Sequence, residues 1–111
     1  MNLLPKEIAD TIPKLYEQEA KGEDAIVFIK FFDPCGRWSW FATEFDGEDT
    51  CFGLVDGFEM ELGYFSLKEL QSYKGPLKIG IERDLWFRPC TLKELKQTLS
   101  GRSDCTVGGL Y

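Results

Sequence analysis

The stretch between residues 25 and 65 constrains the fold most, because it consists of short apolar runs separated by turn residues. Each run is rich in β-branched and aromatic residues and too short for a helix of average length. The last two runs flank Asp56-Gly57, a dipeptide typical of tight hairpins. The pattern predicts a four-strand antiparallel meander. Its strands are AIVFIKFF (25–32), WSWFATEF (38–45), CFGLV (51–55) and FEMELGYF (58–65).

Helix signals lie on both sides of this meander. Apolar residues at i, i+4, i+7 and i+8 predict a helix over residues 5–20, kinked or restarted at Pro13. Ser66 and Thr91 each precede a glutamate by three residues, which is the capping box that opens a helix. The run 79–87 between these two helices predicts a fifth strand.

These elements predict one α+β domain over residues 1–100. Its N-terminal helix and two short C-terminal-half helices should pack on one face of the sheet. The last helix should end at Gly101. Residues 101–111 have no periodicity and predict a flexible tail.

Turn length predicts how the strands pair. A two-residue turn at Asp56-Gly57 would pair Val55 with Phe58, and simple five-residue loops would pair residue 45 with 51 and 32 with 38. One face of the sheet would then be an apolar core face, made of Val27, Ile29, Phe31, Phe41, Phe45, Val55, Phe58, Met60 and Leu62. The other would mix aromatic and acidic side chains, with Phe28, Lys30, Phe32, Trp38, Trp40, Glu44, Phe52, Leu54, Glu59 and Glu61. Such a mixture suits a protein-binding surface, because rings supply buried area and acids supply steering. The candidate partner-binding residues are Trp40, Glu44, Asp46, Glu48, Asp49, Phe52, Glu59 and Glu61.

The charge distribution supports this surface. The 111-residue chain has a net charge of −6, and residues 38–67 contain seven acids with no lysine or arginine. Direct binding to nucleic acid is disfavoured, since a phosphate backbone requires a basic footprint. A basic protein partner is favoured instead, although a plain solvated acidic loop would look the same.

Residues that carry chemistry are sparse. The chain has no histidine, and its four cysteines form no CxxC pair, so we expect neither a catalytic residue, a bound metal nor a cofactor. Reduced thiols are expected, because the chain shows no secretion signal. A carboxylate- or divalent-metal-dependent enzyme remains the alternative, with oxygen ligands from the acids at 44–49. Glu44 and Glu61 would lie two strands apart, about 9.6 Å, which is too far for easy shared coordination.

No apolar run approaches the roughly 20 residues that a membrane span requires. Lys6, Glu7 and Asp10 interrupt the start of the chain, where a signal peptide would need an apolar core. We therefore expect a cytoplasmic protein without a membrane partner.

The runs WFATEFDGEDTCFGLVDGFEMELGYFSLKEL (40–70) and IERDLWFRPCTLKEL (81–95) resemble a family of small acidic bacterial proteins of unknown function. Members are found on conjugative plasmids, integrative elements and prophages. The resemblance covers most of residues 1–97 and brings no catalytic residues with it. It implies a counter-defence inhibitor, of the anti-CRISPR or antirestriction type, which would dock on a basic host protein that handles nucleic acid. A homodimeric accessory protein of the mobile element is the other reading.

Overall fold

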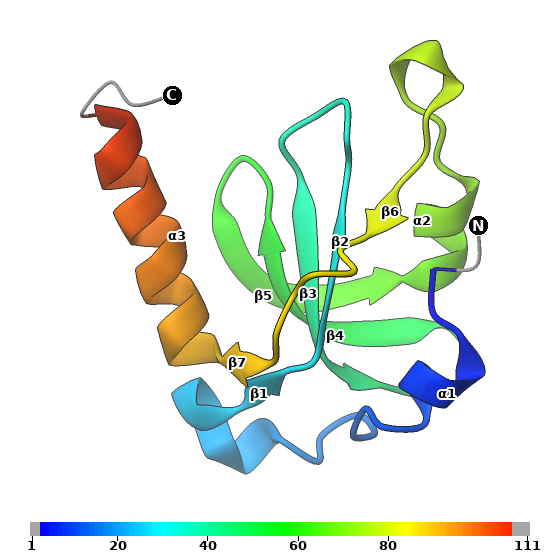
Figure 1. The fold of residues 1–111 in the computed structure, drawn as a ribbon. Coiled ribbons are helices and arrows are strands. Elements are labelled where there is room, and N and C mark those ends of the chain that lie inside the picture. The colour runs from blue at the N-terminus through cyan, green and yellow to red at the C-terminus, as the bar shows by residue number, and fades with distance from the viewer. Residues whose placement is uncertain (1–2, 108–111) are drawn as a thin grey trace.

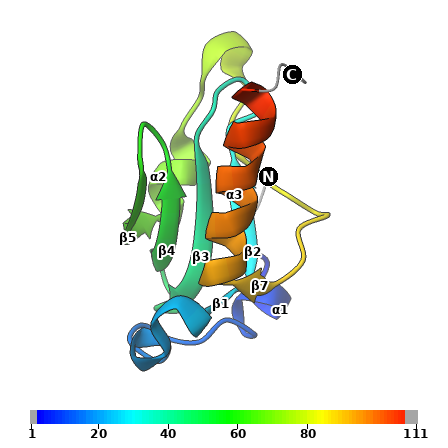
Figure 2. The ribbon, with the colours of Figure 1, turned by 90° about the vertical axis from the view of Figure 1, so that its left-hand side faces the viewer.

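In the computed structural model, which describes residues 3–107, the four long runs form the predicted antiparallel meander. β2 (Ile29–Phe32) pairs with β3 (Ser39–Phe45), β3 with β4 (Thr50–Asp56) and β4 with β5 (Met60–Ser66). β6 (Glu82–Arg83) joins the free side of β2. Figure 2 shows β5, β4, β3 and β2 following one another in this order. The α+β class and the fifth strand are confirmed.

Two predicted strands are shorter than the sequence indicates. The run 25–32 is divided at Phe28, and its first part, β1 (Ile26–Val27), pairs with β7 (Cys90–Thr91) instead of the main sheet. Of the predicted strand 79–87, only the two residues of β6 pair with β2. The chain before β6 forms a hairpin that contains a short 3-10 helix, η2 (Pro76–Lys78).

Helices cover both faces of the sheet. On one face, α3 (Leu92–Val107) packs its leucines against Phe41 and Leu54. On the other, α2 (Leu67–Ser72) and the N-terminal segment pack against Phe31 and Phe45. Figure 1 shows the sheet between α3 on its left and α1 (Lys6–Ala9) with α2 on its right. The expectation of helices on one face only is wrong, because neighbouring residues of β3 are apolar toward both sides. We call these the α3 face and the α2 face.

The capping box at Thr91 is confirmed, and at Ser66 the structure shows its N-cap half. The Ser66 hydroxyl accepts the Glu69 N–H at 3.2 Å, and the Thr91 hydroxyl accepts the Glu94 N–H at 3.1 Å. The Glu94 carboxylate in turn accepts the Thr91 N–H at 3.0 Å. α3 continues through Gly101 to Val107, so neither the predicted helix end nor the term "short" fits it. Of the predicted tail 101–111, residues 108–111 lie outside the described residues.

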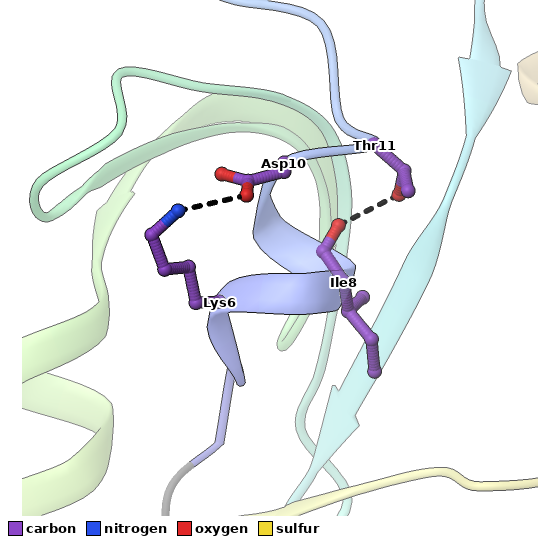
Figure 3. Close-up of polar contacts among 4 residues, drawn as sticks. All are labelled: Lys6, Ile8, Asp10 and Thr11. Atoms are coloured by element: carbon purple, nitrogen blue, oxygen red, sulfur yellow. Dashed lines mark hydrogen bonds and ion pairs between the residues drawn. The ribbon is translucent and has the colours of Figure 1, made fainter.

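The predicted helix over 5–20 is the largest error in secondary structure. Only α1 is α-helical in that stretch, and a 3-10 helix, η1 (Glu19–Asp24), follows later. Figure 3 shows the end of α1, where the Thr11 hydroxyl donates to the Ile8 carbonyl at 2.6 Å. The same figure shows the ion pair that joins the Lys6 and Asp10 side chains at 3.0 Å.

Pro13 explains why the helix does not resume. Proline has no N–H to donate, and its carbonyl here accepts the Phe45 N–H at 2.9 Å. The segment between α1 and η1 therefore runs as an irregular chain along the end of β3. Its apolar residue Ile12 is buried in the core on the α2 face.

The strand register differs from the prediction at three places. Phe45 pairs with Cys51 as expected, but β3 carries a bulge between Ala42 and Glu44. Because one extra residue reverses the side-chain alternation, Phe41 and Phe45 lie on opposite faces. Phe32 pairs with residue 39, not 38.

The third difference is the turn between β4 and β5. Asp56 pairs with Met60, which leaves a three-residue loop, 57–59, where the sequence predicted a two-residue turn. The Trp38 ring lies so close over Gly57 that an added Cβ would be 2.5 Å from it. This loop shifts β5 by an odd number of residues, so Met60 lies on the exposed part of the sheet and not in the core.

Candidate functional site

Three of the predicted partner-binding acids lie in the loop between β3 and β4, where two of them hold the backbone. One Asp46 carboxylate oxygen accepts the N–H groups of Glu48, Asp49 and Thr50 at 2.8 to 3.1 Å. Partial burial raises the pKa of Asp46, but these donors outweigh it, so its pKa lies below the ordinary value. The Glu48 side chain is exposed beside them.

Asp49 ties the same loop to α2. Its carboxylate accepts the Ser66 hydroxyl at 2.6 Å and the Lys68 N–H at 2.7 Å. These hydrogen bonds lower the pKa of Asp49. Asp49 therefore caps the N-terminus of α2, where a negative charge is favourable.

Glu44 was expected on an exposed face, and this is wrong. Its side chain is only 4% exposed, and its two oxygens accept the N–H groups of Tyr16 and Gln18, both at 2.8 Å. The buried Gln18 amide continues the network by donating to the carbonyls of Ile26 and Thr43. Glu44 thus replaces the hydrogen bonds that the irregular N-terminal segment lacks, and it is unavailable to a partner.

The remaining predicted residues divide between the two faces of the sheet. Phe52 lies on the α3 face, where its ring packs edge-on against Tyr64 with centroids 5.0 Å apart. Trp40 pairs with Val55, and Val55 with Glu61, so these side chains share the α2 face. The structure therefore brings Trp40, Glu59 and Glu61 toward one region and places the other predicted residues elsewhere.

That region is a hollowed surface on the α2 face, which we call the tryptophan cleft. Trp38 lies at its centre, with ring centroids 6.0 Å from Trp40 and 5.4 Å from Phe58. On one side of Trp38 is a hollow of about 390 Å³ that reaches α2 and Tyr73. On the other is an open hollow of about 530 Å³ lined by Trp38, Val55, Phe58, Glu59 and Glu61.

The charged residues of the tryptophan cleft are all acidic. Asp33 and Glu69 line the first hollow, and Glu59 and Glu61 line the second. No lysine or arginine is among the lining residues in the described part of the chain. A cleft with aromatic walls and carboxylates at its rim suits a partner that presents basic side chains.

Sequence reasoning missed the two aromatic residues that shape this cleft. Trp38 belonged to the mixed face but not to the predicted site, and Phe58 was assigned to the core. Phe58 is 94% exposed, because the three-residue loop carries it past the end of the sheet. Turn residues precede Trp38 and flank Phe58, and this was the sequence signal that could have placed both rings at the surface. Turns and loops run over the surface of a protein, so an aromatic residue in one is readily left exposed.

Groups suited to catalysis or metal binding do not gather in the described residues. Among the side chains that the structure describes, those of residues 3–75 and 77–100, no three acids, cysteines or histidines come together as metal ligands. Desolvation by burial, helped by the nearby Asp46 carboxylate, raises the pKa of Cys51 to about 12, which removes it as a nucleophile at neutral pH. Cys35, Cys51 and Cys90 are free thiols.

In residues 3–107 no helix is both long enough and apolar enough to cross a membrane. The family described as protein of unknown function (DUF2958) matches residues 3–98, and the chain belongs to that family. Neither the curated proteins nor the solved structures give a match to the chain.

Proposed function

We propose that this DUF2958 protein is a non-enzymatic binding module, which docks the tryptophan cleft on a basic surface of another protein. The observation that carries the proposal is the cluster of Trp38, Trp40 and Phe58, in a cleft whose charged lining residues are all acidic. Exposed aromatic rings beside carboxylates provide the two components of a protein-binding hot spot, an apolar anchor and electrostatic steering.

The partner class follows from charge. A net charge of −6 opposes binding to a phosphate backbone, so the protein competes for the basic surfaces that bind nucleic acid. We place the protein in the bacterial cytoplasm, encoded by a mobile genetic element. There it would inhibit a host defence enzyme of the restriction or CRISPR type.

A transformation assay tests the counter-defence role. The protein is expressed in one strain that restricts unmodified plasmid DNA and in another whose CRISPR nuclease targets the plasmid. We expect transformation to rise in one strain, because the inhibitor covers the nuclease surface that binds DNA. Unchanged transformation in both strains would overturn the counter-defence role.

Variants then test the cleft. Phe58→Ala with Glu61→Lys should abolish this rise in transformation, which is the relief of host defence. Both side chains are exposed at the cleft and neither supports the fold. Glu7→Lys is the control, because it changes the net charge by the same two units and Glu7 is exposed and lies away from the cleft. Equal loss in both variants would mean that net charge alone matters. Binding of the protein to a labelled DNA duplex at about 150 mM salt would contradict the absence of direct nucleic-acid contact.

A further inference from the structure

β5 is an edge strand as long as β3 and β4. It spans seven residues and has β4 on one side only, whereas the opposite edge of the sheet, β6, has two residues. Natural sheets protect their edges with lysine, proline, bulges or very short strands, because an open edge pairs with other chains. Of these devices and of charged side chains, which also protect edges, residues 60–66 contain only the single charge of Glu61.

Residues of β5 alternate between bonding to β4 and pointing away from it, and the pattern shows which N–H and C=O groups have no partner in β4. Two bonds fix the pattern at either end of the hairpin, from Leu67 N–H to the Asp49 carbonyl at 2.9 Å and from Gly57 N–H to the Glu59 carbonyl at 3.2 Å. Both pairs lie in the β4–β5 register, so odd-numbered residues of β5 bond to β4 and even-numbered residues point outward. The outward residues are Met60, Leu62 and Tyr64, followed by Ser66, where the strand passes into α2.

The side chains of the same three residues form an exposed apolar row. Met60 is 42% exposed, Leu62 47% and Tyr64 55%, and all three lie on the α3 face. Beside them is a mainly apolar groove of about 390 Å³ that includes Phe52, Leu62, Tyr64 and Tyr16. On the α2 face the same strand carries Glu61 at the tryptophan cleft.

From this geometry we infer that β5 accepts an extended segment of the partner as a sixth strand, with alternating apolar and basic residues. Outward N–H and C=O groups of β5 would bond to its backbone, as in other cases of strand addition. Its apolar side chains would lie beside Leu62 and Tyr64, and its basic side chains beside Glu61 on the opposite face. The inference rests on the proposed function and specifies how the partner docks.

A second copy of the chain is the competing occupant, and charge disfavours it. Pairing β5 with another β5 would bring a net charge of −6 against a second −6 along an edge that already carries Glu59 and Glu61. A basic strand would instead neutralise these acids.

The test uses a synthetic peptide of alternating lysine and valine, about seven residues long to match the strand. We expect it to shift the amide NMR signals of Met60, Leu62 and Tyr64 and to slow their hydrogen exchange. A peptide of the same sequence, N-methylated at alternate residues, should bind about tenfold more weakly, because it keeps the charge but cannot pair. Equal binding by both peptides, or no binding at all, would overturn the inference.

A protein variant provides the second measurement. Leu62→Pro removes one outward N–H without breaking a bond to β4, and edge strands accept such prolines. Circular dichroism should show a folded protein, and the peptide should bind about tenfold more weakly than to the Leu62→Val control. If Leu62→Pro does not fold, the N-methylated peptide still decides the question.

Three further outcomes distinguish a failure of strand addition from a failure of the proposed function. If sedimentation shows that the native chain is a dimer and that Leu62→Pro abolishes the dimer, a second copy of the chain occupies the β5 edge. That result would overturn the inference of a partner strand. If the Leu62→Pro protein keeps the relief of host defence and the Phe58→Ala with Glu61→Lys protein loses it, strand addition is overturned. The proposed function then stays intact. If both variants keep the relief of host defence, the tryptophan cleft has no part in it, and the proposed function is overturned.

Discussion

The inner acidic region, residues 43–53, and the outer acidic region, residues 58–64, both contain carboxylates but use them differently. Inside, Glu44, Asp46 and Asp49 accept backbone N–H groups that the irregular N-terminal segment, the β3–β4 loop and α2 would otherwise leave unpaired. Outside, Glu59 and Glu61 line an open hollow. Negative charge in a sequence therefore does not identify a binding surface, because acids also complete the backbone hydrogen bonds of loops and helix ends.

The largest expected effect is on Glu44. Glu44→Lys should lower the free energy of unfolding by about 3 kcal/mol or more, because it buries an unpaired charge and leaves the Tyr16 and Gln18 N–H groups without an acceptor. Urea unfolding followed by tryptophan fluorescence measures the change. Glu61→Lys is the matched control from the outer region, expected within about 0.5 kcal/mol of the native value. A Glu44→Lys protein of native stability would contradict the structural role of Glu44.

Two glycines, one in each acidic region, allow the packing of the two regions to be compared without any change of charge. Gly53 and Gly63 face each other across β4 and β5. A Cβ on Gly53 would lie 1.7 Å from the Phe41 carbonyl oxygen, whereas one on Gly63 would meet nothing within 4 Å. Gly53→Ala should therefore destabilise the protein by about 2 kcal/mol. Gly63→Ala should leave stability unchanged or slightly higher, because it restricts the unfolded chain. Equal thermal midpoints for the two variants would contradict the close approach of β3 to Gly53.

Much of the fold was predictable from local signals. Strand composition identified the four strands of the meander, and the capping boxes at Ser66 and Thr91 located the starts of α2 and α3. These features depend on residues adjacent in sequence, so a single sequence contains them. The family match in turn covers nearly the same residues as the resemblance.

The site was less predictable, because it depends on register. One bulge in β3 and one extra residue in the loop 57–59 each reverse the side-chain alternation, and neither has a clear local signal. Together they moved Glu44 into the core and Phe58 out of it. The N-terminal segment was misread for a similar reason, since its apolar spacing suits a helix while its hydrogen bonds go to β3 and Glu44.

The inner carboxylates should also make stability depend on pH. The folded pKa of Asp46 lies below its ordinary value of 3.8, so the unfolded chain binds the proton more readily. Its stabilising effect is present above about pH 4 and is lost as the pH falls through the folded pKa. We expect the urea midpoint of the native protein to decline below that pH, and Asp46→Asn to flatten the decline modestly because the carboxylate is solvent-screened.

Glu48→Gln is the control for this measurement. Its side chain is exposed and has no hydrogen bond or ion pair with the side chains described for residues 3–75 and 77–100, although it lies in the same loop. The acid-side profile of Glu48→Gln should match that of the native protein. A profile of Asp46→Asn that also matches would show that the backbone bonds of the β3–β4 loop do not depend on the charge of Asp46.

The smallest effect is expected in the outer region. Glu59→Lys with Glu61→Lys reverses two charges on exposed side chains that bond to no other group within the described residues. Because exposed charges contribute little to folding, the free energy of unfolding should change by less than about 0.5 kcal/mol, as for the control Glu7→Lys with Asp24→Lys. Urea unfolding at low and high salt measures both variants. A cleft variant more than about 1 kcal/mol less stable than the control would mean that the outer acids support the fold, as the inner ones do. If the stabilities agree, any loss of partner binding in the cleft variant can be attributed to the docking surface and not to unfolding.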